Sequence, residues 1–337
     1  LGNRLVVKRY SIHRHLLCCA CLILLFASCG GPQPVVEEPA PAVEEPIGAT
    51  AFTPAGQAPA VRVLVTEPSS SIRARIPSAF FIGEDPTEPP VKRFDSGGDL
   101  IIRPLGNRLV VKRSGKDLHK APVITIRKVG DGNIYINGKP YRGGFTFRST
   151  QGGVIAINDI DIDDYIKGVL PSEIGYLRED QFEAYYVQAI ASRSYSMSKL
   201  EEKRLEMYDL KATIMDQVYR GVQGEHPEAS RAVDDTRGTV AIFSGIPARM
   251  YYSACCGGHS GDIRIGWPWK DAYPYLYGGR DAPDGEGGKS FCYRSPHFRW
   301  RVHWSGRTLE SILKKTLPKE LGVKSSTVGR LQDIVSK

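Results

Sequence analysis

The segment "GVLPSEIG" contains a single glutamate, Glu173, among valine, leucine and isoleucine residues. Pro171 and Gly175 predict a turn at this point of the chain. A carboxyl group that is desolvated in such surroundings has a raised pKa, which is the property that a general acid needs near neutral pH. The alternative is that Glu173 stands at the end of a loop and caps the helix that follows. The local residues leave both interpretations open.

A helix is predicted over residues 179–206, because apolar and aromatic residues recur there at helical spacing. Gln188, Ser192 and Tyr195 lie at spacings of four and three, so they share one side of this helix, and Arg193 stands beside them. In a groove these side chains would offer hydrogen bonds, and Tyr195 a stacking surface. The alternative is that Gln188 and Arg193 are buried and bind backbone carbonyl groups.

The stretch "YYSACCGGHSGD", residues 251–262, predicts a second wall of such a groove. Tyr252 and Ser253 supply aromatic and hydroxyl groups at the end of a predicted strand, "ARMYYSA". Gly257 and Gly258 would let the backbone approach a ligand closely. The combination is typical of a floor on which a polymer binds.

Three cysteines of the chain's body could form a metal site or a disulfide. Cys256 and His259, together with Cys292 and His297, have a spacing that suits tetrahedral zinc. The competing prediction is a disulfide between Cys256 and Cys292, the usual state outside the cytoplasm, which would stabilise the fold by roughly 3–4 kcal/mol. Cys255 is left over and should point to the opposite face, into the core. A third hypothesis is a catalytic Cys/His pair, but no segment supplies a residue that would orient the histidine.

The first residues read as an export signal. Residues 1–28 carry basic side chains and no acidic one, and an apolar run at 16–26 ends in "FASCG". This ending is similar to that of a bacterial lipoprotein signal, with Cys29 as the acylated residue. A signal cleaved without lipid, or an uncleaved anchor, are the alternatives. Residues 29–60 are rich in Pro, Glu and Ala and predict an extended tether. We therefore expect a lipid-anchored protein of the cell envelope.

The chain has 337 residues and a formal net charge of +8, about half of which lies in the signal. This mild excess argues against a nucleic-acid partner, which would require a dense stripe of Lys and Arg. Residues 1–9, "LGNRLVVKR", recur unchanged at 105–113. Two copies without a period indicate a short duplication and not a solenoid.

The body, residues 61–337, predicts an α+β fold, because strands and helices are grouped without steady alternation. We expect a β-rich part at 61–157, a part that forms a groove at 158–317 with a main helix, and a smaller inserted or flanking β subdomain. The C-terminal strands are "GTVAIF", "ARMYYSA" and "RWRVHW", with a helix near 308–316. The earlier strands are expected at 61–65, 100–104, 107–113, 123–129 and 133–138, and in "GGFTFRST" and "GVIAIND".

Several motifs appear in the order typical of one family. "DIDDYIKGVLPSEIG", "YYVQAIASRSYSMSK", "DQVYRGVQGE", "AVDDTRGTVAIFSG", "YYSACCGGHSGD" and "SPHFRWRVHWSGRTLESIL" together resemble the SpoIID/LytB domain of the stage II sporulation protein D family. The resemblance spans roughly residues 61–317. Its glutamate motif falls on Ser172 and Glu173. The chain departs from the pattern at "YLRED", where relatives often have Trp-Pro, so the groove's edge should differ.

The resemblance implies a secreted bacterial protein that acts on peptidoglycan. Some members are lytic transglycosylases that cleave glycan strands stripped of peptides with one glutamate as acid and base; others enhance a separate amidase. In the first case no second carboxylate and no cofactor are required, although zinc binding in some members supports the structural zinc considered above. Expected partners are glycan strands, the membrane through the lipid and, in the alternative, an amidase. Asp163, Asp164, Glu179 and Asp180 are assigned no chemistry, the first pair being expected in a strand-to-helix turn.

Overall fold

The computed structural model describes residues 6–9, 59–270, 273–282, 288–324, 326 and 329–330. Apart from residues 6–9, the predicted signal lies outside these residues, as do Cys29 and nearly all of the tether. The chain divides into two compact units, Leu1–Tyr252 and Ser253–Lys337. No helix within the described ranges combines the length and the apolar composition needed to cross a bilayer.

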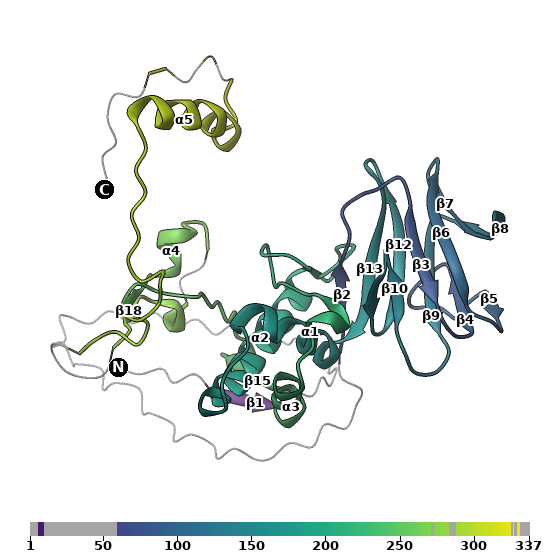
Figure 1. Ribbon diagram of the computed structural model, residues 1–337, viewed down its shortest axis with the longest axis horizontal. Helices are drawn as coiled ribbons and strands as arrows, with labels where there is room; N and C mark the ends of the chain where they lie inside the picture. The colour runs from purple at the N-terminus through teal and green to yellow at the C-terminus, as the bar shows by residue number, and fades with distance from the viewer. Residues whose placement is uncertain are drawn as a thin grey trace, which may run out of the picture. The chain divides into compact units, whose positions relative to one another are not determined.

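A β-sandwich forms the first half of the first unit (Figure 1). One sheet has seven strands in the order β14-β2-β13-β12-β9-β4-β5, and the other has six in the order β11-β10-β3-β6-β7-β8. Neighbouring strands are antiparallel except β14, which pairs parallel with β2. The bounds are β2 Ala60–Leu64, β3 Ile72–Ile76, β4 Phe80–Gly83, β5 Lys92–Phe94, β6 Gly98–Leu105, β7 Arg108–Arg113, β8 Lys116–Ala121, β9 Val123–Lys128, β10 Ile134–Ile136, β11 Lys139–Tyr141, β12 Gly144–Thr150, β13 Gly153–Asp161 and β14 Leu210–Lys211.

Alternating apolar and polar residues in the strands show where the core of the sandwich lies. In β3, Ile72, Ala74 and Ile76 are buried while the two intervening arginines are exposed, as expected for a strand with one face in the core. Phe80 and Phe145 are fully buried and belong to the same continuous cluster of apolar side chains. Burial of this apolar surface holds the two sheets together.

The second half of the first unit is helical. Helix α1 (Ile162–Ile174) follows β13 directly and contacts α2 (Glu183–Glu202) and α3 (Pro227–Asp235). The Asp161 carboxylate caps α1 by accepting hydrogen bonds from the backbone N–H groups of Asp163 and Asp164. The remaining elements are the 3₁₀ turns η1 (Glu179–Gln181) and η2 (Gly221–Gly224), and a sheet of β1 (Val6–Arg9), β15 (Thr239–Phe243) and β16 (Ile246–Pro247).

The second unit has little regular structure. A two-stranded ribbon pairs β17 (His259–Ser260) with β18 (Gly279–Arg280). Helix α5 (Gly306–Leu321) begins at Ser305, whose hydroxyl accepts a hydrogen bond from the Thr308 N–H, and ends at Gly322 in a left-handed conformation. The other elements are α4 (Ile263–Gly266) and η3 (Pro274–Leu276).

The predicted α+β class is confirmed, and each of the seven strands expected before residue 158 has a counterpart. Both copies of the duplicated segment contribute strands, β1 and β7. Two expected strands, "ARMYYSA" and "RWRVHW", are wrong, because the structure gives these residues no partner strand. Asp163 and Asp164 also lie inside the first turn of α1, and not in a preceding turn.

Candidate functional site

Glu173 lies in the last turn of α1, so the predicted turn around it is wrong. Pro171 is inside the helix, and Gly175 ends it with a φ of +81°, a conformation that favours glycine. The Glu173 carboxylate accepts a hydrogen bond of 2.5 Å from the backbone N–H of Val218. The glutamate thus joins the end of α1 to the segment 216–220.

Burial raises the pKa of Glu173 above its usual value, and the hydrogen bond from Val218 opposes the shift. No charged side chain among the described residues contributes to this pKa shift. Desolvation therefore shifts this carboxyl toward its protonated form.

Gln217 is the centre of a buried hydrogen-bond network beside Glu173. Its side chain is fully buried, and its carbonyl oxygen accepts hydrogen bonds from the hydroxyls of Tyr165 (3.2 Å) and Ser196 (2.8 Å). Its amide nitrogen donates to the hydroxyl of Tyr252 at 2.8 Å. Because each end of the amide is bound, Gln217 holds Tyr252 in one position.

Tyr252 is a predicted groove residue that lies close enough to Glu173 for the charge of the carboxylate to affect it. Burial raises the pKa of Tyr252 to about 12, the Glu173 carboxylate adds to this shift, and hydrogen bonds with Gln217, Ser192 and Gln188 oppose it. The hydroxyl therefore stays protonated at neutral pH and can donate a hydrogen bond near the carboxyl.

The other predicted groove residues of α1 and α2 are buried or half-buried. Ser192 is fully buried, and Gln188 is half-buried and donates to its hydroxyl at 3.3 Å. Tyr195 is only 8% exposed, and its hydroxyl donates to Asp216 at 2.9 Å. Tyr195 consequently offers no open stacking face. Ser172 is half-buried next to Glu173 in α1.

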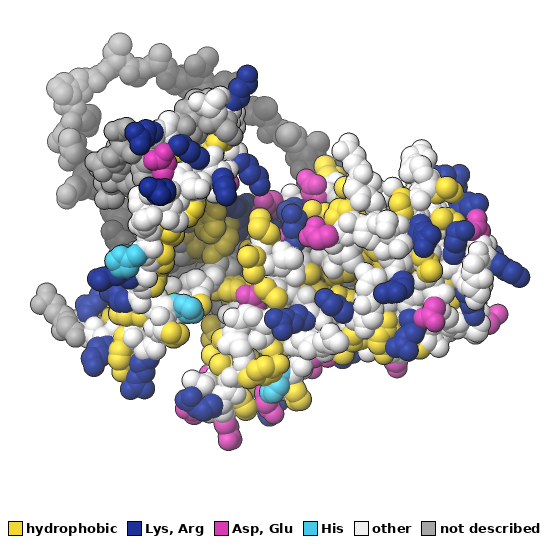
Figure 2. Space-filling model, turned by 45° about the horizontal axis from the view of Figure 1, so that its top comes forward, with side chains coloured by type: hydrophobic (Ala, Val, Ile, Leu, Met, Phe, Trp, Pro, Cys, Tyr) yellow, Lys and Arg dark blue, Asp and Glu magenta, His cyan; other side chains and the backbone are white. Residues whose placement is uncertain are grey.

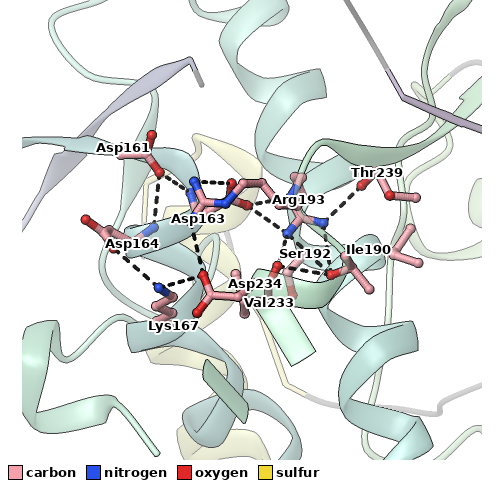
Figure 3. A network of polar contacts seen from close by, with 12 residues as sticks. Asp161, Asp163, Asp164, Lys167, Ile190, Ser192, Arg193, Val233, Asp234 and Thr239 are labelled. Carbon is pink, nitrogen blue, oxygen red and sulfur yellow. Dashed lines mark hydrogen bonds and ion pairs between the residues drawn. The ribbon is translucent and has the colours of Figure 1, made fainter. Parts of the chain in front are cut away.

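Arg193 belongs to the interior of the fold, as the second interpretation of this residue predicts (Figure 3). It is 1% exposed and forms an ion pair of 2.7 Å with Asp163, which is equally buried. Its remaining N–H groups donate to the carbonyl oxygens of Thr239 and Val233. Arg193 thereby joins α1, α2 and α3 to β15 and does not line a groove.

In the second unit three potential ligands come together, and they differ from the predicted set. Ligand atoms of Cys256, Asp281 and Cys292 lie within 4.8 Å of one another. The Cys256 sulfur lies 3.0 Å from an Asp281 carboxylate oxygen and 3.6 Å from the Cys292 sulfur, and both cysteines are free thiols. Two thiols and a carboxylate suit a zinc ion that completes its coordination with a further ligand.

Neither predicted histidine belongs to this group. His259 is exposed and its ring nitrogen contacts the Ser260 carbonyl, and His297 is also exposed. The prediction for Cys255 is wrong as well. It is half-buried in an irregular turn, and a hydrogen bond from Gly257 lowers its pKa, with Cys292 and Ser295 contributing.

Gly257 and Gly258 form the turn that carries Cys256. Their φ angles are +72° and +103°, and a side chain at Gly258 would meet the Ser290 hydroxyl at 2.6 Å. The Gly258 N–H donates to the Cys256 sulfur at 3.4 Å. These glycines, and the exposed Ser253, lie in the second unit, so the structure describes them apart from Glu173.

Residues 150–243, which include Glu173 and Gln217, match the SpoIID family of stage II sporulation proteins. An uncharacterized protein of Brachyspira hyodysenteriae is 33% identical over 173 residues, which make up 51% of this chain and 45% of the relative. The alignment therefore spans less than half of that relative. No solved structure matches the chain significantly. Residues 150–243 are thus the part of the chain that matches the SpoIID family.

Asp281, Asp216 and Gln217 are the site residues to which the sequence analysis gave no role. Gln217 and Asp216 belong to the motif "DQVYRGVQGE", which indicates the family. The motif does not indicate that Gln217 contacts Tyr252 or that Asp216 contacts Tyr195. Asp281 has no local pattern, because pairing of β17 with β18 brings it to the cysteines.

Proposed function

We propose that the SpoIID domain is a lytic transglycosylase that cleaves peptidoglycan glycan strands, with Glu173 as general acid and then base. The family match is consistent with a cell-wall-related function. The observation that supports the enzymatic proposal is the half-buried Glu173 carboxyl, whose pKa is raised by burial without any charged neighbour among the described residues.

The reaction needs one carboxyl group. Glu173 gives its proton to the oxygen that leaves the anomeric carbon, and the glycosidic bond breaks. The carboxylate then accepts the proton of the sugar's own 6-hydroxyl, whose oxygen bonds to the anomeric carbon. The product is a 1,6-anhydro sugar, and Glu173 returns to its protonated form. Tyr252, held by Gln217, would orient the carboxyl or the substrate.

A second function, glycan binding without cleavage that enhances an amidase, is favoured by one observation. The Val218 N–H donates to Glu173 and stabilises its ionised form, as expected if this glutamate only fastens α1 to the segment 216–220.

Product analysis distinguishes the two functions. Purified protein and the Glu173→Gln and Glu179→Gln variants are incubated with peptide-free glycan strands, and fragments are identified by mass spectrometry. Glu179 is exposed and serves as the matched control. Anhydro-ended fragments from the wild type and Glu179→Gln, but not from Glu173→Gln, support the transglycosylase. Binding without fragments supports the amidase-enhancing module, and fragments with reducing ends would indicate hydrolysis and a second carboxylate.

A further inference from the structure

The first unit contains a cleft that none of the roles above uses. It has a volume of about 370 Å³ and lies between the ends of β2 and β11 and the segment that leads into η2. Its lining residues are Leu64, Val65, Thr66, Glu67, Lys139, Tyr141, Lys211, Ala212, Thr213, Tyr219, Arg220 and Gln223.

Positive charge dominates the cleft. Lys139, Lys211 and Arg220 line it, and Glu67 is the only acidic residue of the lining. Within the described part of the chain, none of the three cationic side chains forms an ion pair or a side-chain hydrogen bond. Many Lys and Arg side chains are spread over the sandwich surface seen in Figure 2, but here three of them share one concave site. Such a site attracts an anionic group.

The cleft is built from rigid parts. Gly221 has a φ of +61°, and a side chain there would meet the Pro140 carbonyl at 2.4 Å, so only glycine lets η2 pack against β11. The buried Tyr219 hydroxyl donates to Asn158 at 3.0 Å. The Arg142 guanidinium binds both carboxylate oxygens of Glu225 at 2.7 Å. These contacts fix the cleft wall before a ligand arrives.

The same segment serves the cleft and Glu173. The Val218 N–H binds the Glu173 carboxylate, and the next two residues, Tyr219 and Arg220, line the cleft. The Arg220 N–H also donates to the carbonyl oxygen of Gly168 in α1. One short segment of the chain thus carries both the hydrogen-bond donor to Glu173 and two residues of the cleft lining.

We propose that this cleft binds the carboxylate of the lactyl group on peptide-free glycan strands, an inference that rests on the proposed function. The sugar backbone is otherwise neutral, and each lactyl group is a free carboxylate only where its peptide has been removed. Lys and Arg bind carboxylates by charge-assisted hydrogen bonds, and Lys139, Lys211 and Arg220 supply such donors in the cleft. The cleft thus selects strands that carry this charge.

Binding measurements test the proposal in the full chain with Glu173→Gln, so that no cleavage interferes. The ligands are labelled peptide-free strands, the same strands with carboxylates neutralised by coupling to glycinamide, and peptide-bearing strands. We expect Lys211→Gln/Arg220→Gln to weaken binding of the peptide-free strands about tenfold or more. The same double substitution should leave binding of the neutralised strands unchanged. The preference of the parent protein for peptide-free over neutralised strands should decrease as the salt concentration rises.

The matched control is Arg103→Gln/Lys116→Gln, which removes two exposed cations of the six-stranded sheet and should bind like the parent protein. Circular dichroism verifies that each variant is folded. Unchanged binding by the cleft variant, or an equal loss on neutralised strands, would overturn the proposal. Tighter binding of peptide-bearing strands that depends on Lys211 and Arg220 would also overturn it, because the carboxylate would then belong to the peptide. Cleft binding can persist in a protein that never cleaves, so the two proposals fail separately.

Discussion

Two opposing effects act on the carboxyl of Glu173. Burial favours the protonated form, and the hydrogen bond from Val218 favours the ionised form, with burial the stronger. The position in the last turn of α1 adds to the effect of burial, since the negative end of the helix dipole disfavours a carboxylate. Burial thus favours the proton-donating form of Glu173, and the Val218 N–H stabilises the carboxylate after the proton has left.

The raised pKa of Glu173 predicts a pH-dependent stability. Between the unfolded pKa near 4.5 and the higher folded pKa, the unfolded chain binds fewer protons than the native protein. The free energy of unfolding therefore falls as pH rises through this window. Glu173→Gln removes the titration, so the variant should gain stability relative to the wild type above pH 4.5 and lose this gain below it. Urea unfolding from pH 4 to 8 measures the difference, and a constant difference would contradict the assignment.

Tyr252→Phe tests the role of the hydroxyl held by Gln217. The change leaves the buried Gln217 amide without its 2.8 Å partner, so we expect a loss of about 1–2 kcal/mol in stability. If Tyr252 orients the reacting groups, cleavage should fall by tenfold or more while binding of glycan stays within about twofold. Steady-state kinetics separates the two quantities, and a loss of binding alone would make Tyr252 an ordinary contact residue.

Arg193→Met should destabilise the domain strongly, because the Asp163 side chain would remain buried without its 2.7 Å partner. Breaking such a pair typically costs about 3–5 kcal/mol. The double variant Arg193→Met/Asp163→Asn should recover part of this loss. Denaturant unfolding of the single and double variants measures the coupling, and additive effects would show that the pair contributes little.

At the scale of elements, the cysteine cluster depends on a short ribbon. Pairing of β17 with β18 brings Asp281 to the turn that carries Cys256. We predict that the reduced protein binds one zinc ion per chain at Cys256, Asp281 and Cys292. Cys292→Ser should lose the metal in elemental analysis, whereas His297→Gln should retain it. If the purified protein instead binds no metal and has two titratable thiols fewer than the reduced protein, the Cys256–Cys292 disulfide would be established.

Strands such as β3 could be predicted because their alternating apolar residues indicate which face is buried. β5 and β11 have three residues each, and β8 (KDLHKA) is mostly polar, so no local pattern indicates these strands. The sequence pointed to Glu173 and Tyr252 by type. It could not show that Gln217 binds Tyr252 and that the next residue, Val218, binds Glu173, because these contacts join residues far apart in the chain.

At the scale of the molecule, the SpoIID match covers residues 150–243, which include β13, the helices α1, α2 and α3, and Glu173. The lipid anchor proposed at Cys29 would hold this body at a membrane. Cys29→Ser should then move the protein from the membrane fraction of cells to the soluble envelope fraction. Metabolic labelling with a fatty acid provides the readout, and unchanged labelling of the variant would refute acylation at this cysteine.

The parallel pairing of β14 with β2 has a consequence for folding. The Arg62 N–H donates to the Asp209 carboxylate, which is 147 residues away in the sequence, and α1 and α2 lie between the two strands. We therefore expect β14 to complete the edge of the seven-stranded sheet only after these helices have formed. Closing so long a loop is slow, and β2 remains an open edge during that time. A chain truncated after residue 161 should therefore form strands that aggregate through β2. The native sandwich, the cleft and the Glu173 site are expected to appear together in one late cooperative step.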